Sequence, residues 1–413
     1  MFAEIIINSN ARALNKTFDY IVPKELENTI RIGSRVFVPF GNGKKIDDGF
    51  VINFKDKSEY ATKEIVRIEE KESLEENNIE LAKLMARKYF CNISDCIKLM
   101  LPPGTSSKDA ANRMKEKTGN FVFLKKEIGE VQAFIDEGII KSDKQKRVLN
   151  FLIQNDGTYK TDLEALTEAS PAIIKTLEKN GYIEIREGII ERNPFFNKKI
   201  KRDSRKKLTE EQQICFDGIN KSLKENVYEK SLIYGITGSG KTEIYLQLIE
   251  EVLNKGKTAI VLVPEISLTP QMVDRFLARF GETIAVLHSK LSNGERYDEW
   301  QKIKRGEKKI VIGARSAIFA PVKNLGIIII DEEHDLSYKS DTTPRYNAKD
   351  LAKYIAEKNN APLVLGSATP EMSTMYDAKQ KKINLYVLSK RANKMNLPEV
   401  EIVDLRNELA SRK

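Results

Sequence analysis

A phosphate-binding loop is the clearest chemical signal in this sequence. Residues 235–242 are GITGSGKT, which fits the pattern G-x-x-x-x-G-K-[ST]. The apolar run 231–234 before it predicts a strand, and residues 243–253 after it have the apolar spacing of a helix. Glycines let backbone N–H groups turn onto phosphate oxygens, and a helix N-terminus adds a dipole that favours anions. We expect a nucleoside triphosphate here, held by Gly235, Gly238, Ser239, Gly240, Lys241 and Thr242.

An acidic cluster supplies the second half of this chemistry. The apolar run 326–330 ends in DEEH at residues 331–334. In P-loop proteins an acid at the end of a neighbouring strand holds magnesium, and the loop lysine contacts the β- and γ-phosphates. We therefore predict that Lys241 binds these phosphates, that Thr242 and Asp331 hold Mg²⁺, and that Glu332 polarises the attacking water. A plain cluster of surface acids is the alternative.

A third motif follows a later apolar run. Residues 366–370 are GSATP, and their small hydroxyl side chains are placed to sense the magnesium site and relay its state to a bound polymer. We assign this coupling role to Ser367 and Thr369. GSATP alone is an ordinary turn, so its position after the acidic cluster carries the inference.

Short apolar runs alternating with amphipathic stretches must position these motifs. Such a pattern indicates a parallel sheet covered by helices on both faces. It fills residues 208–413, for which we predict a parallel α/β domain with strands at 231–234, 259–263, 284–287, 309–312, 326–330 and 362–366.

The front of the chain follows different patterns. Residues 1–105 predict a β-rich domain, with strands at 5–7, 18–22, 35–40 and 49–54 and a helix at 79–90. Residues 106–197 predict three helices and a hairpin, with helices at 144–154 and 161–168, a third helix capped by Ser170 and ending at Asn180-Gly181, and the hairpin around Gly188. This order is typical of a winged helix, although a generic small helical domain remains the alternative.

A basic linker joins these domains to the parallel sheet. Residues 198–207 are KKIKRDSRKK, with seven basic residues and one acid. We weigh a solvated tether and a direct phosphate contact equally for this segment. The chain is therefore predicted to be multidomain and α/β overall.

Composition limits the functional class. The chain has 413 residues and a net charge of +9, which permits a nucleic-acid partner without requiring one. No apolar run approaches the length of a membrane span, so we expect a cytoplasmic protein without membrane contact. Three cysteines argue against a disulfide framework, and we interpret Cys91 and Cys96 as buried thiols rather than metal ligands.

The order of the motifs resembles the superfamily 2 helicases of the DExH kind. Longer stretches are similar to the primosomal protein N′ (PriA) family of bacterial replication-restart helicases: TFDYIVP, GSRVFVPFG, KYFCNISDCIKLMLPPG, GITGSGKTE, LVPEISLTPQM, GARSAIFAP, DEEHDLSYKS and GSATP. The resemblance covers essentially the whole chain. It implies an N-terminal domain that binds the 3′ end of DNA, a winged-helix domain and the first RecA-like helicase lobe.

The resemblance also implies roles for particular residues. Phe18, Asp19, Gly41 and Lys63 fall where the family surrounds a 3′ terminus, with Lys63 facing phosphate and Asp19 accepting from the 3′ hydroxyl. The alternative for Phe18 is a place in the core. Gln212 falls where helicases read adenine, but with Thr209 it also fits a capping box, and both roles can hold.

A loop after the acidic cluster completes the implied site. Tyr338, Lys339, Arg345 and Tyr346 interleave aromatic and basic side chains, which suits stacking on single-stranded bases, although a packed surface loop is the alternative. In the family this loop couples DNA contact to ATP hydrolysis, and by analogy His334 takes part in the link.

The resemblance implies an ATP-dependent 3′-to-5′ DNA helicase that recognises stalled forks and starts primosome assembly. The implied cofactors are ATP and Mg²⁺, and the implied partners are forked and single-stranded DNA with a 3′ end, primosome proteins and single-strand DNA-binding protein; we expect a monomer. The family's zinc module and second lobe are not found here, so zinc ligands are absent and we expect weak nucleotide binding and little unwinding. A non-catalytic fork-binding scaffold with a vestigial P-loop is the alternative.

Overall fold

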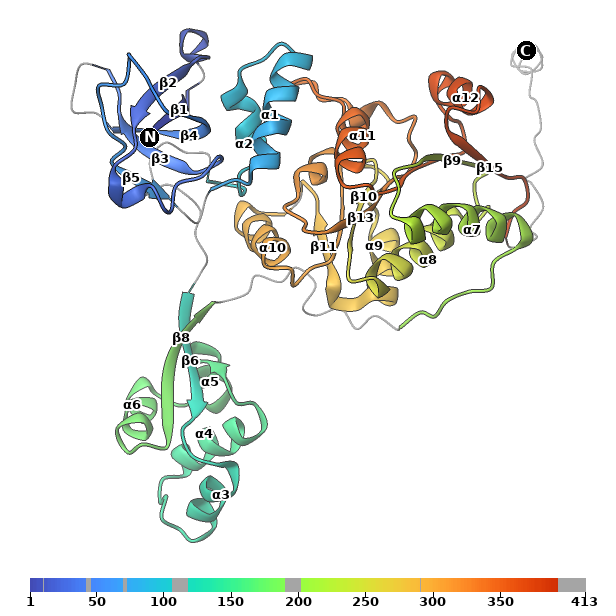
Figure 1. Cartoon of the computed structure of the whole chain (residues 1–413). Helices are drawn as coiled ribbons and strands as arrows, with labels where there is room; N and C mark the ends of the chain where they lie inside the picture. Colours follow the sequence, from blue (N-terminus) through green and yellow to red (C-terminus); the bar gives the residue numbers. More distant parts are fainter. Residues whose placement is uncertain are drawn as a thin grey trace, which may run out of the picture. The chain divides into compact units, whose positions relative to one another are not determined.

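The computed structural model describes residues 1–9, 11–41, 46–69, 73–105, 118–189, 202–289 and 291–392. The chain divides into two compact units (Figure 1). The first contains residues 1–102, 198–290 and 299–413, and the second contains residues 103–197 with the short stretch 291–298. Among the described residues no helix has the length and apolar character that crossing a membrane requires.

The first unit begins with an antiparallel sheet of five strands, ordered β2-β1-β4-β3-β5. Alternate residues such as Ile5, Ile7, Val36, Val38 and Val51 turn into one core, as the two-residue period of a strand requires. The four predicted strands are confirmed; the three-residue β5 was not predicted. The strands are β1 (Phe2–Ile7), β2 (Thr17–Ile21), β3 (Arg35–Pro39), β4 (Ile46–Lys55) and β5 (Arg67–Glu69).

Two helices join this sheet to the rest of the first unit. The predicted helix is α1 (Glu76–Lys88), and α2 (Ile93–Met100) follows it. Met85 on α1 and Ile97 on α2 belong to the same hydrophobic core as Ile328 in the parallel sheet. The sheet and these helices, residues 1–102, are called the N-terminal module below. The module and the parallel sheet therefore share one core.

A parallel sheet of seven strands and its helices form the rest of the first unit, which we call the lobe (residues 208–392, apart from 291–298, which are grouped with the second unit). Its order is β11-β12-β10-β13-β14-β9-β15, and every neighbouring pair is parallel. The carboxyl ends of all seven strands thus lie at one edge. The strands are β9 (Lys230–Gly235), β10 (Thr258–Leu262), β11 (Ile284–Leu287), β12 (Ile310–Gly313), β13 (Leu325–Ile330), β14 (Leu363–Ser367) and β15 (Asn384–Leu388).

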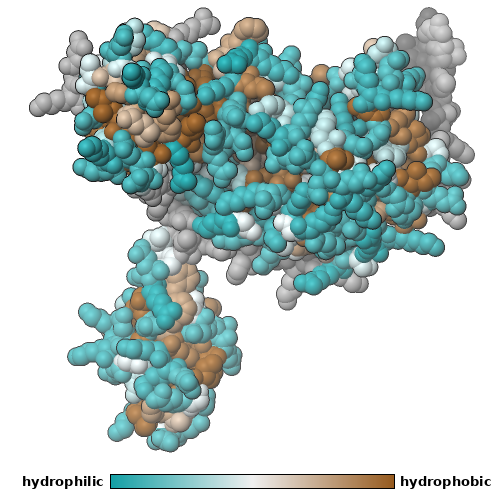
Figure 2. Space-filling view, viewed as in Figure 1, coloured by the Kyte–Doolittle hydropathy of each residue, from teal (hydrophilic) through white to brown (hydrophobic). Residues whose placement is uncertain are grey.

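The six predicted lobe strands are confirmed, whereas β15 was missed. This edge strand carries the apolar run 385–388, but unlike its neighbours it leaves most of its side chains exposed or half-buried. On the face shown in Figure 2, hydrophilic side chains cover most of the lobe. The helices of the lobe are α7 (Glu210–Glu225), α8 (Lys241–Asn254), α9 (Pro270–Phe280), α10 (Asn293–Arg305), α11 (Ala348–Lys358) and α12 (Met372–Lys379).

The second unit packs four helices with a three-stranded sheet ordered β7-β6-β8. The predicted hairpin around Gly188 is wrong. Residues 183–189 form one strand, and its partner is β6, with Gly188 opposite Gly119. The three predicted helices are present, although the Ser170 side chain makes no capping bond. The elements are β6 (Thr118–Leu124), α3 (Ile128–Asp136), α4 (Asp143–Gln154), β7 (Thr158–Tyr159), α5 (Lys160–Thr167), α6 (Pro171–Lys179) and β8 (Ile183–Ile189).

Candidate functional site

The glycine-rich loop connects β9 to α8 at the carboxyl edge of the lobe sheet. Gly238 (φ 82°) and Gly240 (φ 85°) adopt the left-handed conformation that the turn needs. The Lys241 side chain, 8% exposed, donates from Nζ to the carbonyl of Gly235 at 2.8 Å. The Ser239 hydroxyl is buried and has no hydrogen-bond partner within the described part of the chain. The loop therefore contains the Lys241 ammonium group, which is bound to a carbonyl of the loop, and the Ser239 hydroxyl, which makes no hydrogen bond to the described residues.

Gln212 joins this loop to the start of α7. Its Oε1 accepts from the backbone N–H of Thr209 at 2.9 Å, and the Thr209 hydroxyl accepts from Gln212 N in return. Its Nε2 donates to the carbonyl of Ser239 at 2.7 Å. The capping box is thus confirmed. The adenine-reading role stays a prediction, because both ends of the amide are bound to the protein here.

Asp331 follows β13 at the same edge of the sheet. Tyr245 on α8 donates to Asp331 Oδ1 at 3.0 Å. Burial and the charge of Glu332 raise the pKa of Asp331, while the bond from Tyr245 and the charge of Lys241 partly lower it. Lys241 and Asp331 therefore act on each other electrostatically. A buried acid with a raised pKa is one whose charge a bound cation would stabilise.

His334 links the acidic cluster to the GSATP motif. Its Nδ1 lies 2.8 Å from the Ser367 hydroxyl and 3.6 Å from Glu332 Oε2. The Thr369 hydroxyl lies 3.4 Å from His334 Nε2. The predicted coupling residues are thus brought together with Glu332. The His334 imidazole therefore lies between the Glu332 carboxylate and Ser367, the last residue of β14.

Glu333 differs from its neighbours and was missed in the sequence. Its side chain is fully buried and accepts from Glu371 N at 2.7 Å, from the Thr374 hydroxyl at 3.2 Å and from Lys349 Nζ at 3.2 Å. These contacts tie the start of α11 to α12. Within the motif DEEH, Glu333 is therefore structural, and nothing in the sequence pattern distinguishes it from Glu332.

The expected stacking by Tyr338 and Tyr346 does not fit this arrangement. Both rings are buried, at 1% and 3% exposed. The Tyr338 hydroxyl donates to backbone carbonyls of Leu262 and Asp331, and Tyr346 packs edge-on against Phe319. A packed loop therefore describes these two tyrosines.

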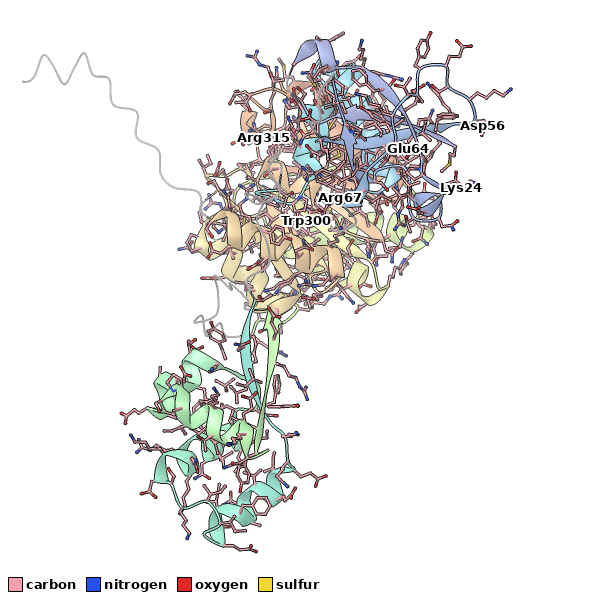
Figure 3. All side chains as sticks on the ribbon, turned by 90° about the vertical axis from the view of Figure 1, so that its left-hand side faces the viewer. Lys24, Asp56, Glu64, Arg67, Trp300 and Arg315 are labelled. Carbon is pink, nitrogen blue, oxygen red and sulfur yellow. The ribbon has the colours of Figure 1, made fainter. Side chains whose placement is uncertain are left out.

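The basic members of that loop have a different environment. Lys339 and Arg345 are exposed, so their predicted contact with DNA is sterically open. Arg315, labelled in Figure 3, donates to the carbonyls of Ser337 and Lys339. Arg315 follows β12, which is separated from β13 by β10, and it binds the loop from that position in the sheet.

Two of the four predicted 3′-end residues, Phe18 and Asp19, lie on opposite faces of β2. Phe18 packs edge-on against Phe40, with ring centres 5.0 Å apart. Asp19 points to the opposite face, where it accepts from the Ser58 hydroxyl at 2.6 Å and from Lys55 Nζ at 3.2 Å. The structure therefore does not place Asp19 beside the Phe18 ring.

Gly41 and Lys63 meet at the rim of an open depression. Lys63 Nζ donates to the carbonyl of Gly41 at 2.5 Å. Lys63 also lines the depression, of about 590 Å³, together with Pro23, Pro39 and Glu64, which is labelled in Figure 3. The depression thus carries one lysine and two glutamates, Glu25 and Glu64, on the domain for which a DNA end was predicted.

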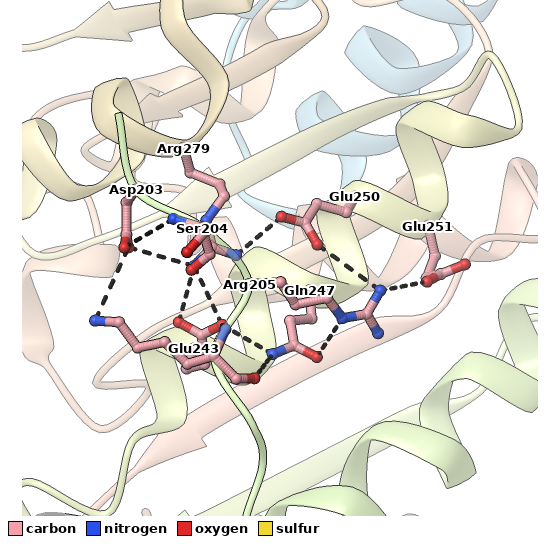
Figure 4. Close-up of polar contacts among 9 residues, drawn as sticks. Asp203, Ser204, Arg205, Glu243, Gln247, Glu250, Glu251 and Arg279 are labelled. Atoms are coloured by element: carbon pink, nitrogen blue, oxygen red, sulfur yellow. Dashed lines mark hydrogen bonds and ion pairs between the residues drawn. The ribbon is translucent and has the colours of Figure 1, made fainter. Parts of the chain in front are cut away.

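The described part of the basic linker, residues 202–207, is bound to the lobe rather than a free tether. Arg279 on α9, with its side chain 3% exposed, donates to Asp203, to the carbonyl of Ser204 and to Glu243 (Figure 4). Arg205 donates to Gln247 and Glu251 on α8. These contacts fix the linker along the helix that follows the P-loop. The remaining linker residues, 198–201, lie outside the described residues.

No group of three or more histidine, cysteine or acidic side chains that could hold a metal occurs in the described ranges. Cys91 and Cys96 lie with their Sγ atoms 3.4 Å apart and form no disulfide. Burial raises the pKa of both thiols. Both cysteines are free, and Cys96 is buried as predicted, whereas Cys91 is only half-buried.

Comparison with known proteins gives matches over both parts of the first unit. A family model described as the 3′ DNA-binding domain (3′BD) matches residues 4–102, and one described as type III restriction enzyme, res subunit, matches residues 205–372. The replication restart protein PriA of Bacillus subtilis (strain 168) is 38% identical over 469 residues, covering 99% of this chain and 58% of that protein. The PriA of Chlamydia muridarum is 36% identical over 424 residues, covering 99% and 54%.

The chain thus spans about half the length of the curated relatives it matches. Among solved structures, RecG bound to a three-way DNA junction aligns with 22% identity and a TM-score of 0.35, covering 50% of this chain and 27% of that one.

Proposed function

We propose a function for the lobe on the ground that this chain belongs to the replication restart protein PriA family. The lobe binds and hydrolyses ATP. This hydrolysis drives a 3′-to-5′ DNA helicase at stalled replication forks. The observation that carries the proposal is the meeting of three motifs at one edge of the sheet. Lys241 lies in the P-loop, Asp331 directly follows β13, and His334 reaches Ser367 at the end of β14.

Each polar side chain at this edge has a role in the proposal. Lys241 leaves the Gly235 carbonyl, or shares its three donors, to bind the β- and γ-phosphates. Glu332 orients the attacking water and accepts its proton. Ser367 and Thr369, through His334, report the state of Glu332 to the DNA-binding side of the lobe.

The described residues fit a magnesium nucleotide. Magnesium in such sites takes most of its ligands from phosphate oxygens and water, so one carboxylate and one hydroxyl suffice from the protein. Asp331 and Thr242 would supply them. The unused Ser239 hydroxyl and the left-handed Gly238 and Gly240 provide room and a donor for phosphate. The ion, when bound, neutralises charge on the phosphates.

The N-terminal module is proposed to bind the 3′ end of a DNA strand. Lys63 and Gly41 lie at the rim of the open depression, and a lysine there suits a terminal phosphodiester. Asp19 is proposed to accept from the 3′ hydroxyl, which requires it to exchange its bonds to Lys55 and Ser58. Phe18, which packs against Phe40, is proposed to lie beside the 3′ terminus.

The remaining roles follow from family membership. We propose that the second unit is a winged helix that docks DNA or protein, and that primosome proteins and single-strand DNA-binding protein are partners. Lys339 and Arg345 are proposed to contact single-stranded DNA. Because the chain spans about half of its relatives, we propose that this chain alone hydrolyses ATP slowly and unwinds little.

ATP hydrolysis with and without forked DNA tests the motor. We expect slow hydrolysis that forked DNA stimulates and that Lys241→Ala abolishes. A fork-binding scaffold with a vestigial P-loop is the rival, favoured by the bond that ties Lys241 to Gly235. Tight fork binding without hydrolysis or nucleotide binding would establish the scaffold and reject the motor.

DNA-end chemistry tests the N-terminal module. Fork binding is measured with a 3′-hydroxyl and a 3′-phosphate end at several salt concentrations. Phosphate contacts alone lose affinity steeply with salt and ignore the end. A specific pocket prefers the hydroxyl at every salt, and Asp19→Ala should remove that preference. Glu4→Ala, which removes a different carboxylate bound to Lys55, is the matched control. A preference that survives Asp19→Ala contradicts the assignment.

A further inference from the structure

The residues that follow β15 lie along the P-loop. We call Leu388–Ala392 the strap. Ile236 N donates to the carbonyl of Leu388 at 3.4 Å, and Ala392 N donates to the carbonyl of Gly238 at 3.0 Å. The strap therefore continues from the edge strand of the sheet across the rim of the loop.

Each P-loop glycine faces the strap. A Cβ atom on Gly235 would lie 3.0 Å from Leu388 Cβ, and one on Gly240 would lie 3.5 Å from Ala392 Cβ. Between these positions, a Cβ on Gly238 would lie 3.9 Å from Cγ and Cδ of Arg391. The methylene groups of Arg391 thus lie next to the loop apex at Gly238. Because Gly238 has no side chain, nothing separates the apex from Arg391 at this point.

A carboxylate at the start of α7 anchors the strap. Glu211 accepts from Ser389 N at 2.8 Å, from Ser389 Oγ at 2.5 Å and from Lys390 N at 3.4 Å. The neighbouring Gln212 donates to Ser239 in the loop. The first turn of α7 therefore holds the strap and the P-loop together, so the strap keeps its position relative to a bound nucleotide.

From this geometry we infer that Arg391 is a nucleotide-binding residue, whose guanidinium contacts the phosphates of a nucleotide on the P-loop. The inference rests on the proposed ATP site. In the sheet, β15 and β13 lie on opposite sides of β9, so Arg391 approaches the loop from the side away from Asp331. A guanidinium presents paired donors that match phosphate oxygens. Lys241 and Arg391 would then bind the same phosphates from two sides.

Titration of the whole chain with a fluorescent ATP analogue tests this inference. Arg391→Ala should weaken binding about tenfold, or ~1.4 kcal/mol, the scale of a hydrogen bond to a charged group. Lys390→Ala is the matched control: it removes one positive charge from the same strap, but Lys390 is exposed, its hydrogen bond to Glu211 comes from its backbone N–H, and its charge acts on Glu211 rather than on the P-loop. Arg391→Lys should recover part of the affinity, and its binding also shows that the strap tolerates substitution. Equal affinities for Arg391→Ala and Lys390→Ala overturn the inference.

Two further arms separate the possible failures. Tripolyphosphate should displace the analogue from the wild type, and less readily from Arg391→Ala; an unchanged tripolyphosphate affinity would assign Arg391 to the nucleoside and overturn the phosphate contact. Lys241→Ala reports on the site itself. If Lys241→Ala abolishes binding and Arg391→Ala does not weaken it, only the inference fails. If the wild type binds no better than Lys241→Ala, the proposed ATP site fails and the inference with it.

Discussion

The hydroxyl of Tyr245 donates a 3.0 Å hydrogen bond to Oδ1 of Asp331 and so joins the two halves of the candidate site. Tyr245 lies on α8, which begins at the P-loop lysine, and Asp331 directly follows β13. The strand between them, β14, makes the contact possible because it has a glycine at this point. A Cβ atom on Gly366 would lie 1.7 Å from the Tyr245 hydroxyl oxygen. The distance between the P-loop and Asp331 therefore depends on Tyr245 on α8, on Gly366 in β14 and on Asp331 after β13.

Tyr245→Phe should shift the pH dependence of magnesium-nucleotide binding. The bond from Tyr245 lowers the pKa of Asp331, which burial raises, so losing the bond raises that pKa further. Asp331 then takes a proton at a higher pH, and the acid limb of binding should move to higher pH. Tyr338→Phe is the control, because its hydroxyl donates to the backbone carbonyl of Asp331 and not to the carboxylate. Equal shifts in both variants would contradict the assignment.

Asp331→Asn should stabilise the protein while weakening nucleotide binding. Because the folded-state pKa of Asp331 is raised, mainly by burial, its charge costs stability once the pH exceeds that pKa. The melting temperature of Asp331→Asn should be higher than that of the wild type at about pH 8. This difference should disappear as the pH falls and Asp331 of the wild type becomes protonated.

Asp335→Asn gives the opposite sign as a control. The hydrogen bonds from Ser337 lower the pKa of Asp335, so its charge contributes stability above the unfolded-state pKa. This variant should lose stability at about pH 8, and the loss should vanish as the pH falls through the folded-state pKa. Changes in melting temperature of the same sign in both variants would show that the pKa values of Asp331 and Asp335 are not shifted in opposite directions.

Adjacent glutamates in DEEH should separate stability from activity. Glu333→Ala removes a fully buried acceptor and leaves Lys349, Thr374 and a backbone N–H without it, so we expect a loss of about 3 kcal/mol in urea unfolding. Glu332→Ala, at a partly exposed position, should change stability by about 0.5 kcal/mol or less and suppress ATP hydrolysis. A stable Glu333→Ala protein would refute the structural role.

Arg279→Ala should release the basic linker from the lobe. The change leaves Asp203, Glu243 and Glu250 without their shared guanidinium. We expect faster tryptic cleavage after Arg205, Lys206 and Lys207, because the linker must leave α8 to enter a protease. Arg279→Lys, which keeps the charge without the fork of donors, should give an intermediate rate. An unchanged cleavage rate would mean that other contacts hold the linker.

The sequence predicted those features that depend on local pattern. Strands buried on both faces, such as β13, are continuous apolar runs, and the P-loop needs its glycines in fixed positions. Features that depend on contacts between residues far apart in the sequence could not be predicted from local pattern. The burial of Tyr338 depends on carbonyls at Leu262 and Asp331, which only the folded sheet brings together. The edge strand β15 has the apolar run 385–388, but Leu385 and Val387 are exposed, so its place in the sheet comes from pairing with β9 rather than from burial on both faces.

The same limit explains the second unit and the linker. Residues 183–189 have the alternation of a strand, but their partner lies more than fifty residues earlier, so the local glycine suggested a hairpin instead. Arg279 gave no signal because its three carboxylate partners come from the linker and α8. For Asp19 the sequence indicates a polar residue on a strand and not which face of the sheet it occupies.

A single helix, α11, connects the place where DNA is proposed to bind with the place where ATP is proposed to be split. The Tyr89 hydroxyl, just after α1, donates to Asp350 and accepts from Asn347 N, both in the first turn of α11. In the same turn, Lys349 is bound to Glu333. The N-terminal module and the acidic motif thus contact the same turn of α11, so a force on the module would be transmitted through that turn to the segment that carries Glu332.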